Sequence, residues 1–64
     1  MKIDPKIRHD FINNSLRLEV LMRLVCDSLQ KDEIPQKQYL DDLDQFLSIE
    51  KNLLSEIKEE ILTH

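Results

Sequence analysis

The residues best suited to chemistry lie near the N-terminus, in the run His9-Asp10-Phe11-Ile12-Asn13-Asn14. An imidazole can accept and release a proton or a phosphoryl group near neutral pH. The carboxylate of Asp10, next to it in sequence, can orient the ring and raise its basicity. Asn13 follows His9 by four residues, so on a helix it shares the same face and can position a water or a partner's group. This spacing predicts a site in which His9 reacts while Asp10 and Asn13 assist.

This run resembles the phospho-acceptor box of two-component histidine kinases, which lies in their dimerisation and histidine-phosphotransfer domain. In that box a helix carries His, then an acidic residue, then Thr or Asn four places after the His. His9, Asp10 and Asn13 fill those three positions, and the likeness covers about residues 7–18. Asn14 stands where the best-known form has a kink-forming proline, so the resemblance implies a straighter helix. The chain would be a short, stand-alone form of that domain, a remnant that docks onto another kinase or regulator, or the excised dimerisation part of a kinase.

The resemblance implies a role for each of these residues. A ring nitrogen of His9 would accept phosphate, Asp10 would hold the other nitrogen, and the phosphoryl group would pass to an Asp of a response-regulator receiver domain. Asn13 would help place the water that removes phosphate from that receiver. A kinase also needs a glycine-rich ATP-binding domain, and this chain has no glycine. We therefore expect at most a phosphotransfer intermediate, whose partner is a receiver domain or a histidine kinase.

A second reading is a non-catalytic helical interaction module, a dimeric adaptor or an inhibitor of a kinase or regulator. In that case His9 is an incidental surface residue, and Asp10 is a favourable anion in the first turns of a helix. Binding of RNA by a dimeric hairpin, as in the plasmid copy-number regulator Rop, is disfavoured by the net charge of −4 and the lack of a Lys/Arg stripe. We expect neither nucleic acid nor a membrane as a partner.

Length and cysteine content indicate how such a chain can be stable. A domain of 64 residues buries only roughly 60% of its unfolded surface, so it is marginal as a monomer. The single cysteine, Cys26, cannot form an internal disulfide, and no metal-ligand spacing or cofactor motif is present. We expect no metal and no cofactor, a reducing cytoplasmic location, and a small buried apolar role for Cys26. There is no apolar run of membrane-spanning length and no signal-peptide core.

Asp4-Pro5 predicts the start of a first helix over about residues 5–31, because Asp can cap free N–H groups and Pro is favoured at the first helical position. One apolar face is expected to contain Ile7, Phe11, Leu18, Leu21, Met22, Val25 and Leu29. A second, partial stripe on its flank consists of Ile12, Leu16, Val20 and Leu24. His9 lies nearly opposite the main face, so we expect it to be accessible to solvent.

Asp32, Glu33 and Pro35 predict a turn over about residues 32–35, followed by a second helix over about 36–62. Its seam is expected to contain Leu40, Leu43, Leu47, Leu54, Ile57 and Ile61. Glu50 interrupts that seam, and we expect it at a solvated edge. A row of Tyr39, Phe46 and Leu53 repeats every seven residues beside the seam.

These elements predict an all-α fold in which residues 1–64 form one antiparallel helical hairpin. One hairpin would leave the second stripe and the Tyr39/Phe46/Leu53 row uncovered. We therefore expect an obligate homodimer that forms a four-helix bundle, with the relative direction of the two hairpins open. The other histidine, His64, is expected to be disordered.

Overall fold

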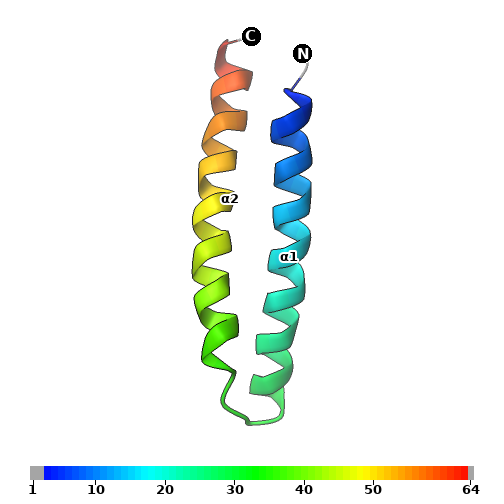
Figure 1. Ribbon diagram of the computed structural model, residues 1–64, viewed down its shortest axis with the longest axis vertical. Coiled ribbons are helices and arrows are strands. Elements are labelled where there is room, and N and C mark those ends of the chain that lie inside the picture. Colours follow the sequence, from blue (N-terminus) through cyan, green and yellow to red (C-terminus); the bar gives the residue numbers. More distant parts are fainter. Residues whose placement is uncertain (1–2, 64) are drawn as a thin grey trace.

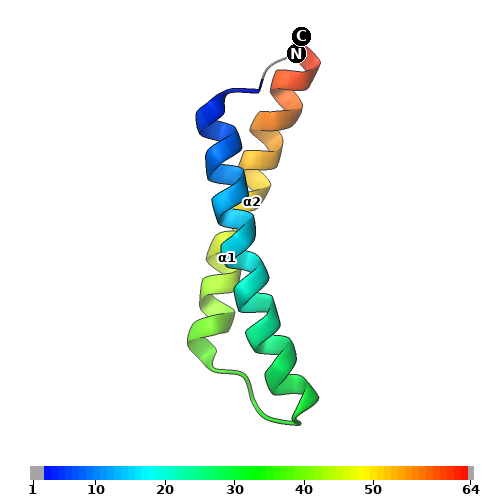
Figure 2. The same ribbon diagram turned by 90° about the vertical axis from the view of Figure 1, so that its right-hand side faces the viewer.

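The computed structural model describes residues 3–63 and consists of two antiparallel helices joined by a short connection (Figure 1). Helix α1 covers Pro5–Gln30 and helix α2 covers Lys37–Thr63. The hairpin is 48 Å long and 15 Å wide, and its helices cross each other in the view of Figure 2. The predicted all-α hairpin is confirmed. The expectation for His64 lies outside the described residues.

The start of α1 is fixed by Asp4. Its Oδ1 accepts a hydrogen bond of 2.8 Å from the backbone N–H of Lys6, and Pro5 occupies the first turn, where no N–H partner is needed. The backbone N–H of Asp4 also donates to Glu60 Oε2 at 3.1 Å. This bond ties the start of α1 to the end of α2, so the segment that carries His9 begins at a defined place on the hairpin.

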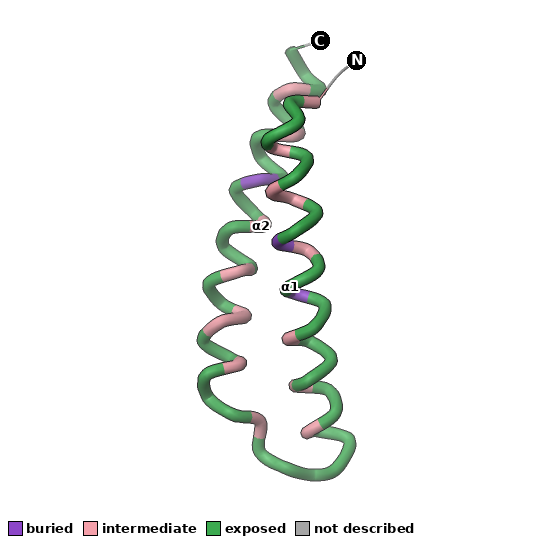
Figure 3. Tube along the Cα trace, turned by 45° about the vertical axis from the view of Figure 1, so that its right-hand side comes forward, coloured by how far each residue is buried: buried purple, intermediate pink, exposed green. Residues whose placement is uncertain are grey.

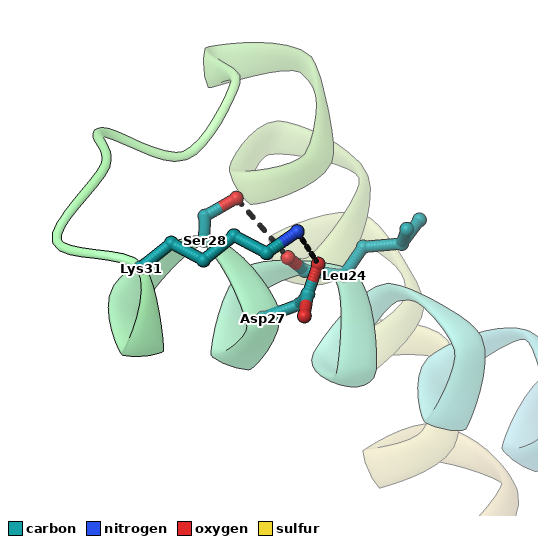
Figure 4. Close-up of polar contacts among 4 residues, drawn as sticks. All are labelled: Leu24, Asp27, Ser28 and Lys31. Atoms are coloured by element: carbon teal, nitrogen blue, oxygen red, sulfur yellow. Dashed lines mark hydrogen bonds and ion pairs between the residues drawn. The ribbon is translucent and has the colours of Figure 1, made fainter.

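At the other end of α1, backbone N–H groups of residues 31–33 bind the last carbonyl oxygens, and two side-chain contacts accompany them (Figure 4). Ser28 Oγ donates to the carbonyl oxygen of Leu24 at 3.2 Å, and Lys31 Nζ lies 3.1 Å from Asp27 Oδ2. Asp32 then adopts a positive φ of 57°, a left-handed conformation that Asp tolerates better than most residues. The chain can therefore reverse between the helices without a glycine.

The two helices contact each other along rows that alternate in spacings of four and three residues, the pattern of a coiled pair. The inward row of α1 contains Ile7, Phe11, Asn14, Leu18, Leu21, Val25 and Ser28. The inward row of α2 contains Tyr39, Leu43, Phe46, Glu50, Leu53, Ile57 and Glu60. All of these side chains are buried or half-buried, and Figure 3 shows their colours alternating with exposed positions along the facing sides.

The core of this hairpin is thin. Leu18 and Leu53 are the buried hydrophobic residues among those described, and no large side chain is fully buried there. The accessible surface of 5342 Å² is about 1000 Å² more than the roughly 4300 Å² expected of a compact 7.7 kDa monomer. A single hairpin therefore leaves an unusual amount of surface in water, and that surface includes many large hydrophobic side chains.

The expected seam of α2 was correct at Leu43 and Ile57, which lie inward, but wrong by one position at its other four residues. Leu40, Leu47, Leu54 and Ile61, which we call the outer row, are 42–52% exposed. The Tyr39/Phe46/Leu53 row, expected on the flank, faces α1 instead. On α1, Met22 and Leu29 are exposed as well, whereas Ile7, Phe11, Leu18, Leu21 and Val25 lie inward as expected. Two adjacent heptad rows of similar hydrophobicity allow either assignment from the pattern alone.

Cys26 was also assigned incorrectly, since its side chain is exposed rather than buried. It follows the inward Val25 by one residue, which turns it about 100° away from α2. A hairpin has only one inward stripe per helix, so a small apolar residue beyond that stripe stays in solvent.

Candidate functional site

His9 lies on the outer side of α1 and is exposed, as its position opposite the apolar face predicted. The side-chain Nδ2 of Asn13 lies 2.8 Å from His9 Nε2. An amide nitrogen can only donate, so Nε2 accepts this hydrogen bond and the neutral ring carries its proton on Nδ1. The helical spacing of four residues thus brings the two predicted site residues together. The lone pair of Nε2 is the group available for nucleophilic chemistry.

Asp10 lies beside this pair without binding the ring. Its side chain is half-buried and lines the same pocket as His9 and Asn13. Within residues 3–63 no hydrogen bond or ion pair joins Asp10 to His9. The assisting role of Asp10 therefore stays a prediction.

The pocket next to His9 has a volume of about 370 Å³ and is formed by both helices. From α1 it is lined by His9, Asp10, Asn13, Asn14 and Arg17, and from α2 by Ile49 and Leu53. The polar groups come from α1 and the apolar wall comes from α2. Such a combination offers hydrogen-bond partners to a small charged group and an apolar surface to whatever carries it.

Directly beneath the pocket, a polar layer joins the helices. Asn14 is only 5% exposed, and its Nδ2 donates at 2.9 Å both to the carbonyl oxygen of Phe46 and to Glu50 Oε2. Ser15 Oγ donates to Glu50 Oε1 at 2.8 Å. The expectation for Glu50 is wrong, because Glu50 does not lie at a solvated edge but pairs with the buried Asn14. Each is satisfied by the other across the hairpin.

The polar layer also fixes which side of α1 faces solvent. A buried amide that must meet a particular carboxylate and carbonyl fixes both the register and the rotation of its helix. Asn13 is the neighbour of Asn14 in sequence, so a helix held with Asn14 inward must present Asn13 about 100° away. The Asn14–Glu50 contact therefore holds His9 and Asn13 toward solvent.

Arg17 is a member of the site that the sequence reasoning missed. It lines the His9 pocket, and its Cζ lies 5.9 Å from the centroid of the Phe46 ring, within the range of a cation–π contact. It also lines a neighbouring, mainly apolar groove of about 430 Å³ with Leu16, Val20, Leu21, Asp42 and Phe46. The spacing of His9, Asn13 and Arg17, four residues each, was the available signal.

Other kinds of site find no support in the part of the chain that the structure describes. No three His, Cys, Asp or Glu side chains in residues 3–63 gather closely enough to hold a metal ion. Neither α1 nor α2 contains a stretch both long and apolar enough to cross a membrane. Comparisons of the chain with family models, with curated proteins and with solved structures found no match.

Proposed function

We propose that this protein is a histidine phosphotransfer and dimerisation module of a two-component-type phosphorelay. His9 accepts a phosphoryl group and passes it to the Asp of a receiver domain. The observation that carries the proposal is the exposed His9 ring with Nε2 bound by the Asn13 amide, because this contact favours the tautomer whose Nε2 lone pair can attack phosphorus. Asp10 at the next position supplies a carboxylate within the same pocket.

The transfer uses the His9 ring, a phosphodonor and the carboxylate of a receiver Asp. Once Asn13 releases Nε2, the lone pair forms a bond to phosphorus and the bond from phosphorus to the donor breaks. The Nδ1 proton is then lost to solvent or to Asp10. In the second step the carboxylate of a receiver Asp attacks phosphorus, the N–P bond breaks, and His9 regains a proton.

The same proposal includes a homodimer that forms a four-helix bundle. The outer row, Leu40, Leu47, Leu54 and Ile61, repeats every seven residues along the whole of α2 and is about half exposed. Each of its members follows an inward residue by one position, as exposed Met22 and Leu29 do on α1. In an antiparallel pair, positions that follow an inward residue by one lie along the same edge of the hairpin on both helices. A second copy can therefore cover the outer row of α2 and Met22 and Leu29 of α1 together.

The accessible surface area of the single hairpin supports the proposed homodimer. The excess of about 1000 Å² per chain over a compact monomer would, if covered in two copies, amount to roughly 2000 Å², the size of a stable interface. His9 lies on the outer side of α1, away from the inward row. Covering the outer row therefore leaves the acceptor ring accessible. We propose a cytoplasmic location, where such relays operate.

The test is to incubate the protein with phosphoramidate, a small histidine phosphodonor, and to characterise any bound phosphate. We expect one phosphoryl group per chain, labile in acid and stable in base, and absent from the His9→Gln variant. Phosphate that survives acid, or equal labelling of His9→Gln, would contradict the proposal. Sedimentation of the unmodified protein at micromolar concentration should show a dimer, and a stable folded monomer would contradict the assembly.

The second candidate is an interaction module without phosphotransfer, a dimeric adaptor or an inhibitor of a kinase or regulator. The exposed outer row favours it, because a long apolar edge can sheath a partner's helix as well as a second copy. In this case no phosphate would be acquired, and His9→Gln would weaken partner binding or assembly. The phosphodonor experiment separates the two functions.

A further inference from the structure

Arg17 is a cation in the His9 pocket that the transfer steps above do not use. Its side chain is exposed and lines the pocket together with His9 and Asn13. In the described part of the chain it forms no ion pair, whereas three other cations pair with a carboxylate one helical turn away: Arg23, Lys31 and Lys37. Its charge is therefore available to an anion that enters the pocket.

The helix directs Arg17 toward the acceptor ring. Long side chains on a helix lean toward its N-terminus, and Arg17 follows Asn13 by four residues just as Asn13 follows His9. Its guanidinium contacts the ring of Phe46, which lines the neighbouring groove, so Arg17 lies at the border between that groove and the His9 pocket. Lys6, which precedes His9 on the same helix, does not line the pocket.

A phosphoryl group on His9 would add negative charge to the pocket, and a nearby cation would stabilise it. A phosphoryl group on His9 Nε2 brings negative charge next to Asp10, and Arg17 is the cation among the residues that line this pocket. A guanidinium is a cation whose N–H groups can donate charge-assisted hydrogen bonds to phosphoryl oxygens. We infer that Arg17 binds the phosphoryl oxygens while the group is exchanged at His9. The inference rests on the proposed phosphotransfer function.

With phosphoramidate as the donor the step is balanced. The Nε2 lone pair bonds to phosphorus and the P–N bond of the donor breaks. The donor nitrogen, protonated before or during this step by solvent, leaves as ammonia. The ring loses its Nδ1 proton to solvent and becomes neutral phosphohistidine. Arg17 takes no part in bond making. It attracts the anionic donor to Nε2 and neutralises the oxygens throughout.

The experiment compares the second-order rate constant for phosphorylation of His9 by phosphoramidate in four proteins: wild type, Arg17→Gln, Arg17→Lys and Arg23→Gln. Arg23→Gln is the matched control, because it removes an exposed arginine of α1 outside the pocket. Circular dichroism and melting of each variant report whether the fold is retained. A repeat at high salt tests whether the effect is electrostatic, since salt screens exposed charges.

We expect Arg17→Gln to lower the rate constant roughly tenfold, as for the loss of one charge-assisted interaction. Arg17→Lys should recover most of the rate, because it keeps the charge without the planar fork, and Arg23→Gln should match wild type. High salt should shrink the difference between wild type and Arg17→Gln. A purely structural role would not produce rescue by lysine together with this dependence on salt.

If wild type is phosphorylated and Arg17→Gln reacts at the same rate, the assignment of Arg17 is overturned and the proposed function stands. So would a slow Arg17→Gln variant that is not rescued by Arg17→Lys. Wild type that acquires no phosphate would overturn the proposed function, and the role of Arg17 with it.

Discussion

The side-chain amide of Asn14 lies 2.9 Å from the carboxylate of Glu50, so that a buried residue of α1 and a seam residue of α2 satisfy each other across the hairpin. Ser15 binds the second oxygen of the same carboxylate. The contact replaces a layer of apolar packing in a core that has little of it. We expect this contact to contribute more to the unique alignment of the two helices than to the free energy of unfolding.

The first prediction concerns this layer. Asn14→Leu should destabilise the protein by about 1–3 kcal/mol, because it leaves the Glu50 carboxylate half-buried without its amide donor. The double change Asn14→Leu with Glu50→Leu should recover that loss or exceed wild-type stability. Urea denaturation of the two single variants and the double variant measures the coupling. Additive effects would show that the contact contributes nothing specific.

The double variant should also lose specificity. Without the polar layer, the leucines of adjacent rows can exchange places, so we expect more than one oligomeric state. Sedimentation velocity of the double variant checks this. A single sharp dimer, indistinguishable from wild type, would contradict the role of Asn14 in fixing the register.

The next prediction distinguishes the two heptad rows of α2. Leu47→Asp places a charge on the exposed outer row and should abolish the dimer, leaving a weakly stable chain whose melting no longer depends on its concentration. Leu53→Asp buries a charge between the helices and should abolish cooperative melting, at a cost of at least about 3 kcal/mol. Ser48→Asp, at an exposed position outside both rows, is the control. A dimeric Leu47→Asp variant would contradict the proposed interface.

These rows also show where the sequence was sufficient and where it was not. Asp4-Pro5 and Pro35 were enough to predict two helices and the connection between them. The seam of α2 was predictable only in part, because Leu47 and Phe46 belong to neighbouring rows with the same period. What decides between them is Asn14, which binds the backbone of Phe46 and the side chain of Glu50. A single sequence presents these two polar residues as interruptions, and only their pairing reveals them as part of the core.

The sequence likewise predicted only part of the candidate site. His9 and Asn13 meet because a spacing of four residues on a helix is a local property. The pocket depends on Ile49 and Leu53 of the other helix, so its shape follows from the register that the sequence left open. Arg17 belongs to the same local stripe, but its contact with Phe46 needs both helices in place.

His9→Gln should leave helix content and melting nearly unchanged. The ring is exposed and bonds only to Asn13 among the described residues, so the expected effect is below about 0.5 kcal/mol. The same variant should acquire no phosphate from phosphoramidate. Circular dichroism melting together with intact-mass measurement checks both parts. A large fall in melting temperature would favour the interaction-module function.

Asn13→Ala should have a different signature. The helix should become more stable by about 0.5 kcal/mol, because alanine is the better helix former at an exposed position. Phosphate should still load onto His9, whereas loss of phosphate from a partner receiver should slow. Without the amide on Nε2, the neutral ring should populate both tautomers, which long-range ¹H–¹⁵N spectra resolve. The same tautomer ratio in wild type and variant would contradict the role of Asn13 in fixing the ring.

The most direct test of the central claim is the ¹⁵N spectrum of the histidine rings after incubation of the wild-type protein with phosphoramidate. The proposed mechanism predicts phosphate on Nε2 of His9, with a coupling from phosphorus to that nitrogen and an unmodified His64 ring. An unmodified His9 ring, under conditions in which free imidazole is phosphorylated, would contradict the claim that this chain carries phosphate.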